Sequence, residues 1–185
     1  MSLTKEHQQQ LLALAKRAIE YGVRTGRPLK LVLADFPAEL TELRATFVTL
    51  EKHHQLRGCI GMLEAVRPLA EDIAENAYAA AFNDPRFPPL RAEELSELDI
   101  HLSILTQPEP VFFTSEQELL GQLQPGVDGL ILEAGRRRGT FLPSVWESLP
   151  EPAQFLRHLK QKAGLPSDYW SDTVRVYRYR TEVIA

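Results

Sequence analysis

Apolar side chains recur at every second position of residues 98–105, and other side chains stand between them. The apolar positions are Leu98, Ile100, Leu102 and Ile104. This period of two predicts a β-strand with one buried face. Asp99, His101 and Ser103 would project from the opposite face. The chain must therefore supply other elements that cover the apolar face of a sheet.

Helical patterns provide that cover. Leu11, Ala15 and Ile19 fall on one stripe of the first predicted helix, in which Thr4 is a plausible cap. The predicted helices run from about Lys5 to Gly26, from Pro68 to near Asn83, from Ser115 to Leu123, and from near Pro152 to Gly164. The other strand-like runs are Arg44–Glu51, Leu56–Leu63, Gly129–Ala134, Thr140–Leu142 and Thr173–Ile184, and Leu29–Leu33 reads as a short strand or an extended segment. We expect an α+β fold, with a mixed, mostly antiparallel sheet and flanking helices in a single 185-residue domain.

Composition narrows the functional classes. Lys and Arg number 21 against 25 Asp and Glu, so the net charge of −4 argues against nucleic-acid binding as the main role. One cysteine excludes an intramolecular disulfide, and the sequence shows no metal-ligand spacing, so we expect no metal and no cofactor. No long apolar run predicts a membrane span or a signal peptide. We therefore expect a cytoplasmic protein.

The hexapeptide Leu56-Arg57-Gly58-Cys59-Ile60-Gly61 holds that only cysteine between two glycines. In a regular strand Arg57 and Cys59 share one face, which allows an arginine–thiol pair. Gly58 and Gly61 have no side chains, so the main chain there can approach a ligand closely or form a bulge against a packed helix.

Cys59 has three interpretations. As a tentative catalytic nucleophile it needs a neighbouring base or positive field, for which Arg57, His53, His54 and His101 are the candidates. As a small hydrophobe it would be buried in the core. As a ligand contact it would line a site without reacting.

Residues 83–90 contain three prolines and predict a rigid loop. That rigidity would position Asp84 and Arg86 beside a cleft, or the two would form an internal ion pair with Phe87 as a core anchor. His101 would line a second surface or serve as a hydrogen-bonded structural histidine. The ligand-binding candidates are Arg57, Gly58, Gly61, Asp84, Arg86 and His101.

Two basic segments raise a further alternative. Arg136–Arg138 reads as a turn between strands that would bind an anion or stay solvated. Residues 175–180 interleave arginines with tyrosines, which suits base stacking or a charged edge strand equally well.

The hexapeptide and the later stretch Ala80-Ala81-Phe82-Asn83-Asp84-Pro85-Arg86-Phe87-Pro88-Pro89-Leu90 together resemble the AMMECR domain family. Its bacterial and archaeal members are commonly labelled AmmeMemoRadiSam system protein A. The resemblance implies a two-lobed α+β fold, with intimately packed lobes and the hexapeptide at a cleft. It also implies cooperation with Memo-like and radical S-adenosylmethionine proteins, although this chain lacks the three-cysteine cluster of radical chemistry.

The resemblance assigns no reaction, so whether the chain is an enzyme stays open. Our leading interpretation is an AMMECR-like domain whose cleft around the hexapeptide binds a small molecule or a peptide. The first alternative is a non-enzymatic protein-interaction module. The second is a weak RNA-binding protein.

Overall fold

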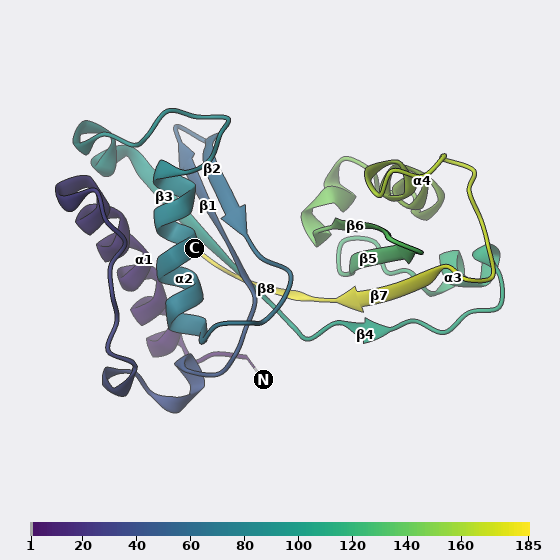
Figure 1. Ribbon diagram of the computed structural model, residues 1–185, viewed down its shortest axis with the longest axis horizontal. Helices are drawn as coiled ribbons and strands as arrows, with labels where there is room; N and C mark the ends of the chain where they lie inside the picture. The colour runs from purple at the N-terminus through teal and green to yellow at the C-terminus, as the bar shows by residue number, and fades with distance from the viewer. Residues whose placement is uncertain (1) are drawn as a thin grey trace. The chain divides into compact units, whose positions relative to one another are not determined.

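The computed structural model describes residues 2–185, which form two compact units (Figure 1). Unit 1 contains the described residues up to Leu105 together with Glu182–Ala185, and unit 2 is Thr106–Thr181. Each unit combines helices with a four-stranded sheet. The predicted α+β class is therefore confirmed.

Unit 1 places two long helices against one sheet. Its sheet has the strand order β2-β1-β3-β8, and β1 runs antiparallel to both of its neighbours. The helices are α1 (Lys5–Thr25) and α2 (Leu69–Phe82), the strands are β1 (Thr46–Lys52), β2 (Gln55–Gly61), β3 (Leu98–Leu105) and β8 (Thr181–Ile184), and the 3-10 turns are η1 (Leu33–Asp35), η2 (Ala38–Leu40) and η3 (Ala92–Glu97).

The alternation of residues 98–105 has the predicted structural meaning. Leu102 and Ile104 of β3 are fully buried, as are Val48 and Leu50 of β1, and all four pack with α1 and α2 in one core. The helices thus cover one face of this sheet (Figure 1). We call the opposite face, which carries His101, the outer face.

Unit 2 is a smaller sheet with the strand order β4-β7-β5-β6. Phe155 of its longest helix stacks on Trp146 with ring centroids 3.7 Å apart, and Lys160 is buried with its Nζ 2.6 Å from Glu116 Oε1. The elements are β4 (Glu109–Pro110), α3 (Glu116–Gln122), β5 (Gly129–Ala134), β6 (Arg137–Phe141), η4 (Pro143–Glu147), α4 (Pro152–Lys162) and β7 (Arg175–Tyr179). None of the helices within residues 2–185 has the length and apolar character needed to cross a bilayer.

The helix boundaries follow the predicted capping signals. The Thr4 side chain accepts a hydrogen bond from the His7 amide, and the Ser115 side chain accepts one from the Glu118 amide. Gly26 ends α1 with a φ of 71°, a left-handed conformation that glycine adopts without a steric penalty.

Two predicted elements differ in the structure, and Leu29–Leu33 takes the second of its two predicted forms, an extended segment. It joins no sheet, and its last residue begins η1. Thr173–Ile184 is not one strand, because the strand is interrupted at Arg180. The two parts, β7 and β8, belong to different sheets. The turn at Arg136–Arg138 is shorter than predicted, because Gly135 with a φ of 63° lets β6 start at Arg137.

Helix α2 comes within main-chain contact of β2 at Gly58. A Cβ atom on Gly58 would stand 2.1 Å from the Ala80 carbonyl oxygen, well inside van der Waals contact. Gly61 is covered in another way, because the Phe47 ring lies 2.3 Å from the place of its missing Cβ. The two glycines of the hexapeptide are thus required by packing.

We expect Gly58→Ala to destabilise the protein by about 1–3 kcal/mol, because the added methyl group meets a helix backbone that cannot rotate away. Urea denaturation followed by circular dichroism would measure the change. Gly121→Ala in α3 is the matched control, since nothing lies within 4 Å of its added Cβ. Equal unfolding midpoints for the two variants would contradict the packing role.

Candidate functional site

The hexapeptide lies on the second strand of a hairpin that contains a β-bulge. His53 and His54 form the two-residue turn with φ values of 53° and 61°, the left-handed pair that a type I′ turn requires. The register then shifts between Leu50 and Glu51, so that Leu50 pairs with Gly58 while Glu51 pairs with Leu56. Residue 57 is the extra residue of the bulge.

The bulge removes the regular alternation on which the predicted arginine–thiol pair depended. Arg57 is only 7% exposed, and its Nε donates to Glu94 Oε1 over 3.0 Å. Its Nη2 donates to the Pro88 carbonyl over 2.8 Å and to Glu94 Oε2 over 3.2 Å. The guanidinium therefore ties β2 to the proline loop and to η3, rather than lying beside the thiol of Cys59.

Glu94 is the acidic partner of this buried cation. The hydrogen bonds from Arg57 lower the pKa of Glu94 to about 2, and the amide of Arg91 adds to the effect. Lys52 Nζ also lies 3.5 Å from Glu94 Oε1. The carboxylate is thus ionised over the whole physiological pH range.

Asp84 binds the main chain at the exposed edge of β2. The residue is 4% exposed, and Oδ2 accepts the Cys59 amide over 3.0 Å and Arg86 Nη2 over 2.8 Å. Oδ1 accepts the Arg86 amide over 3.1 Å and Arg86 Nε over 3.0 Å. These bonds, above all the one from the Arg86 side chain, hold the pKa of Asp84 far below its usual range.

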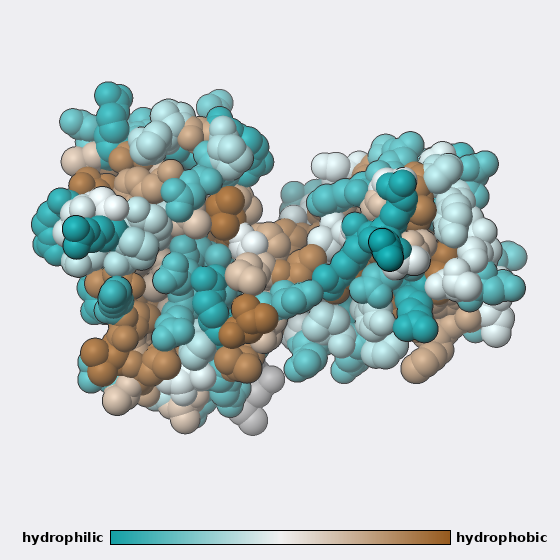
Figure 2. Space-filling model, viewed as in Figure 1, coloured by the Kyte–Doolittle hydropathy of each residue, from teal (hydrophilic) through white to brown (hydrophobic). Residues whose placement is uncertain are grey.

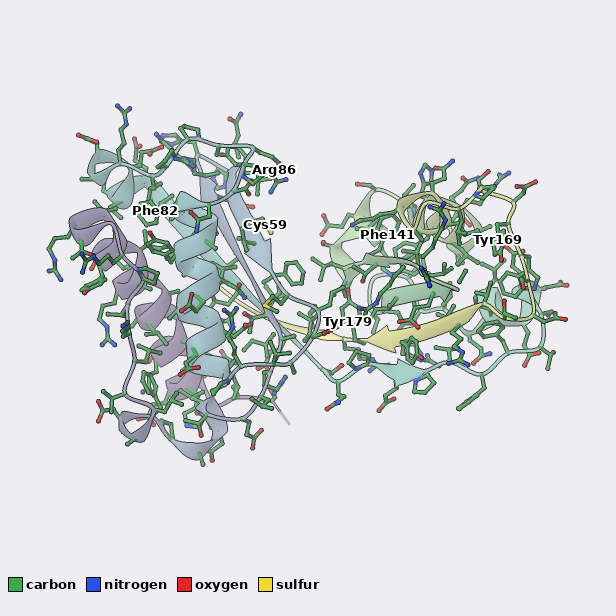
Figure 3. All side chains as sticks on the ribbon, viewed as in Figure 1. Cys59, Phe82, Arg86, Phe141, Tyr169 and Tyr179 are labelled. Atoms are coloured by element: carbon green, nitrogen blue, oxygen red, sulfur yellow. The ribbon has the colours of Figure 1, made fainter. Side chains whose placement is uncertain are left out.

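Arg86 completes the edge, because its Nη2 lies 3.5 Å from the Cys59 carbonyl oxygen (Figure 3). The Asp84–Arg86 pair thereby takes the place of a further strand beside Cys59, with one group that accepts the amide and one that donates to the carbonyl. Strand edges attract unwanted pairing, and this ion pair occupies the edge. Of the predicted internal arrangement, the Asp84–Arg86 ion pair is present. Phe87 is not a core anchor, because it is half-buried and its ring faces the guanidinium groups of Arg57 and Arg86.

The thiol of Cys59 is partly exposed, and Thr49 supplies its polar neighbour. Thr49 Oγ1 lies 3.3 Å from Cys59 Sγ, and Thr49 pairs with Cys59 on one side and with His101 on the other. His101 Nε2 lies 3.3 Å from Glu51 Oε2. Cys59, Thr49 and His101 therefore form a cross-strand row on the outer face. In this row, Thr49 of β1 lies between the thiol of Cys59 on β2 and the imidazole of His101 on β3.

The structure separates the predicted site residues into two groups. Gly58, Arg57 and Asp84 are buried and hold the hairpin, helix and loop together. Cys59 and His101 reach the outer face, and Arg86 is exposed at the edge. Sequence reasoning missed the three side chains on which these groups depend, which are Thr49, Phe47 and Glu94.

This arrangement offers a binding surface more readily than covalent catalysis. A nucleophilic thiol requires a positioned base or a positive field. The hydrogen-bonding neighbour of the Cys59 sulfur is the Thr49 hydroxyl, and the Arg86 cation that interacts with Cys59 is paired with Asp84. Within residues 2–185 no three His, Cys, Asp or Glu side chains gather into a potential metal site.

The basic segments of unit 2 are partly neutralised within their own sheet. Arg138 Nε lies 3.4 Å from Glu133 Oε1 on the paired strand, and Arg178 Nη1 lies 3.9 Å from the buried Asp128 Oδ2. Such pairs favour the interpretation of charged strand residues over a nucleic-acid surface.

We expect Glu94→Gln to lower the stability by about 2–3 kcal/mol at pH 7, because it leaves the buried Arg57 without its counter-charge. The pKa of Glu94 is lowered from 4.5 to about 2 in the folded protein, so its stabilisation is complete above pH 4.5 and disappears as the pH falls toward 2. Urea titrations between pH 2 and 7 should therefore show a flatter acid limb in the variant. The exposed neighbour Glu93→Gln is the control, and an unchanged acid limb in Glu94→Gln would disprove the pairing.

We expect Asp84→Ala to expose the Cys59 amide to solvent, because the carboxylate is its acceptor. Hydrogen exchange measured by NMR should accelerate at Cys59 by roughly tenfold more than at Leu50, whose pairing within the sheet is retained. The surface variant Asp99→Ala should leave both rates unchanged. Parallel acceleration at Cys59 and Leu50 would show a general loss of stability instead.

Comparisons with known proteins agree with the fold and leave the chemistry unassigned. The family model described as AMMECR1 matches residues 12–184. A protein of Methanothermobacter thermautotrophicus is 40% identical over 98% of this chain and 95% of its own, and one of Thermococcus gammatolerans is 42% identical over 94% and 87%. The crystal structure of the uncharacterised protein PH0010 from Pyrococcus horikoshii matches with a TM-score of 0.88 and 36% identity, covering 98% of this chain and 92% of that one.

Proposed function

The chain belongs to the AMMECR1 family, and from this premise we propose that it is a binding domain whose ligand, a small molecule or a peptide, docks on the outer face of unit 1 around Cys59. The observation that carries the proposal is the row formed by Cys59, Thr49 and His101, which stays partly exposed, whereas Arg57 and Gly58 of the hexapeptide are buried. Rigid, partly exposed polar groups are what a specific binding site needs.

The surroundings of the row define the ligand chemistry. The Phe47 ring over Gly61 supplies an apolar surface on the same face, next to the thiol and the Thr49 hydroxyl. Arg86 adds a cation at the strand edge, but its charge is already balanced by Asp84. A ligand with an apolar body and one or two uncharged hydrogen-bonding groups fits this set better than a multiply charged anion.

The binding role also accommodates cooperation with other proteins. In this proposal the domain holds its ligand for a partner that performs the chemistry. The Memo-like and radical S-adenosylmethionine proteins implied by the family resemblance are the candidate partners. The thiol itself forms no covalent intermediate.

A screen of small soluble fragments and tetrapeptides, observed by amide NMR shifts, tests the site. We expect saturable shifts at Thr49, Cys59 and His101. Binding should be lost in Cys59→Trp, because the large indole side chain would block access to the neighbouring Thr49 and His101 side chains. Cys59→Ser should bind within about threefold of the parent, since a hydroxyl replaces the thiol as a polar contact. Val183→Trp, at an exposed position of β8 in the same sheet, is the matched control. Hits that survive Cys59→Trp would refute the location.

Alkylation separates binding from nucleophilic catalysis. We expect Cys59 to react with iodoacetamide no faster than free glutathione, because the hydrogen-bonding neighbour of its sulfur is a hydroxyl and the nearby Arg86 cation is balanced by Asp84. Intact-mass measurement over time gives the rate, with Cys59→Ser as the unreactive background. A rate at least roughly tenfold above that of glutathione would instead support an activated nucleophile.

A further inference from the structure

An extended apolar segment on unit 1 has no place in the proposed function. Leu29 and Leu31 pack partly buried against the core, whereas Lys30 and Val32 point outward, with Val32 63% exposed. This alternation is that of a strand, yet the segment lies outside both sheets. In Figure 2 apolar surface gathers at the lower left of unit 1, around this segment and the start of η1.

The main chain of this segment is unpaired. In the part of the chain that the structure describes, the amides and carbonyls of Leu29, Lys30 and Leu31 make no hydrogen bonds, and the first bond runs from the Asp35 amide to the Val32 carbonyl. The backbone of Val32 is itself extended, with φ of −99° and ψ of 104°. A short row of free donors and acceptors in extended conformation is a template for one more strand.

A groove of about 370 Å³ runs beside the segment, on the side of α1. One wall is a helical stripe of α1 and the other is the segment with the residues that follow it. The lining residues used here are Ala13, Arg17, Lys30, Val32, Asp35 and Phe36. A second groove of about 300 Å³ lies on the side of α2, where Glu71 and Glu75 stand next to Lys30.

Charge distinguishes the two grooves. Among the described residues, Arg17 and Lys30 have no ion-pair partner, and Asp35 is the only acidic residue lining the groove beside α1. That groove is therefore net positive, whereas Glu71 and Glu75 make the other one net negative. An acidic occupant is directed to the groove beside α1.

We propose that the groove beside α1 binds an extended peptide segment of a partner protein that is both acidic and apolar, and that this segment pairs with Leu29–Val32 as an added β-strand. Its main chain meets the free amides and carbonyls of the segment. Alternate side chains rest on Val32 and Phe36, and its carboxylates face Arg17 and Lys30. The site is separate from the row around Cys59, so either can fail without the other.

The probe is a fluorescein-labelled octapeptide of two Val-Val-Glu-Glu repeats, in which valine and glutamate alternate along each face of an extended strand. It is titrated with the full-length chain by fluorescence anisotropy. We expect saturable binding that is roughly tenfold tighter than that of the lysine-for-glutamate peptide at low salt. Arg17→Glu combined with Lys30→Glu should reverse this preference. Lys5→Glu combined with Arg157→Glu is the control, because it makes the same change in net charge at exposed positions outside the groove.

Two N-methylated versions of the probe test the strand pairing. Methyl groups on every second amide block one edge of the peptide, so one version should lose binding by roughly tenfold and the other should keep it. The proposal would be overturned if the two versions bound equally, or if the acidic peptide showed no saturable binding. It would also be overturned if decanoate displaced the probe and the probe's binding did not depend on N-methylation. Amide NMR shifts confined to residues outside 10–36 would do so as well.

Discussion

The contact between helix α2 and strand β2 at Gly58 determines where the remaining parts of the site lie. With a Cβ atom excluded by the Ala80 carbonyl, the helix backbone rests directly on the strand. The loop that leaves α2 after Phe82 consequently starts beside the β2 edge. Asp84 can then reach the Cys59 amide with a short side chain, and the Pro88 carbonyl can reach Arg57. A larger residue at position 58 would move all of these groups away together.

Two ion pairs convert this close approach into a rigid arrangement. Asp84 and Glu94 are carboxylates held ionised by arginines, and each also accepts a main-chain amide. Buried charges are tolerated only when they are paired and hydrogen-bonded. The two carboxylates must therefore keep their arginine partners for the fold to be stable. The arginine of the hexapeptide thus serves the fold, although a residue of this type in such a motif first suggests anion binding.

Sequence reasoning succeeded where structure is local. The caps at Thr4 and Ser115 and the alternation of residues 98–105 depend on neighbouring residues alone. The bulge could not be foreseen, since the register of the turn, continued regularly from the pair of Lys52 with Gln55, would place Thr49 opposite Gly58 instead of Cys59. The pattern of Leu29–Leu33 fits a strand or an extended segment, and the segment stays outside both sheets because helices receive its apolar side chains.

The Asp84–Arg86 ion pair limits what a ligand at the proposed site could contact. A ligand group that took Arg86 away from Asp84 would leave a buried carboxylate without its main counter-charge, and this would raise the free energy of the folded protein. Any anion that Arg86 holds must therefore be held while Asp84 stays bound to it. The side chains free of such obligations are those of Phe47, Thr49 and Cys59, which lie side by side on the outer face. In the proposed function, recognition would accordingly depend on shape and uncharged hydrogen bonds, and the thiol would contribute one small, polarizable contact among them.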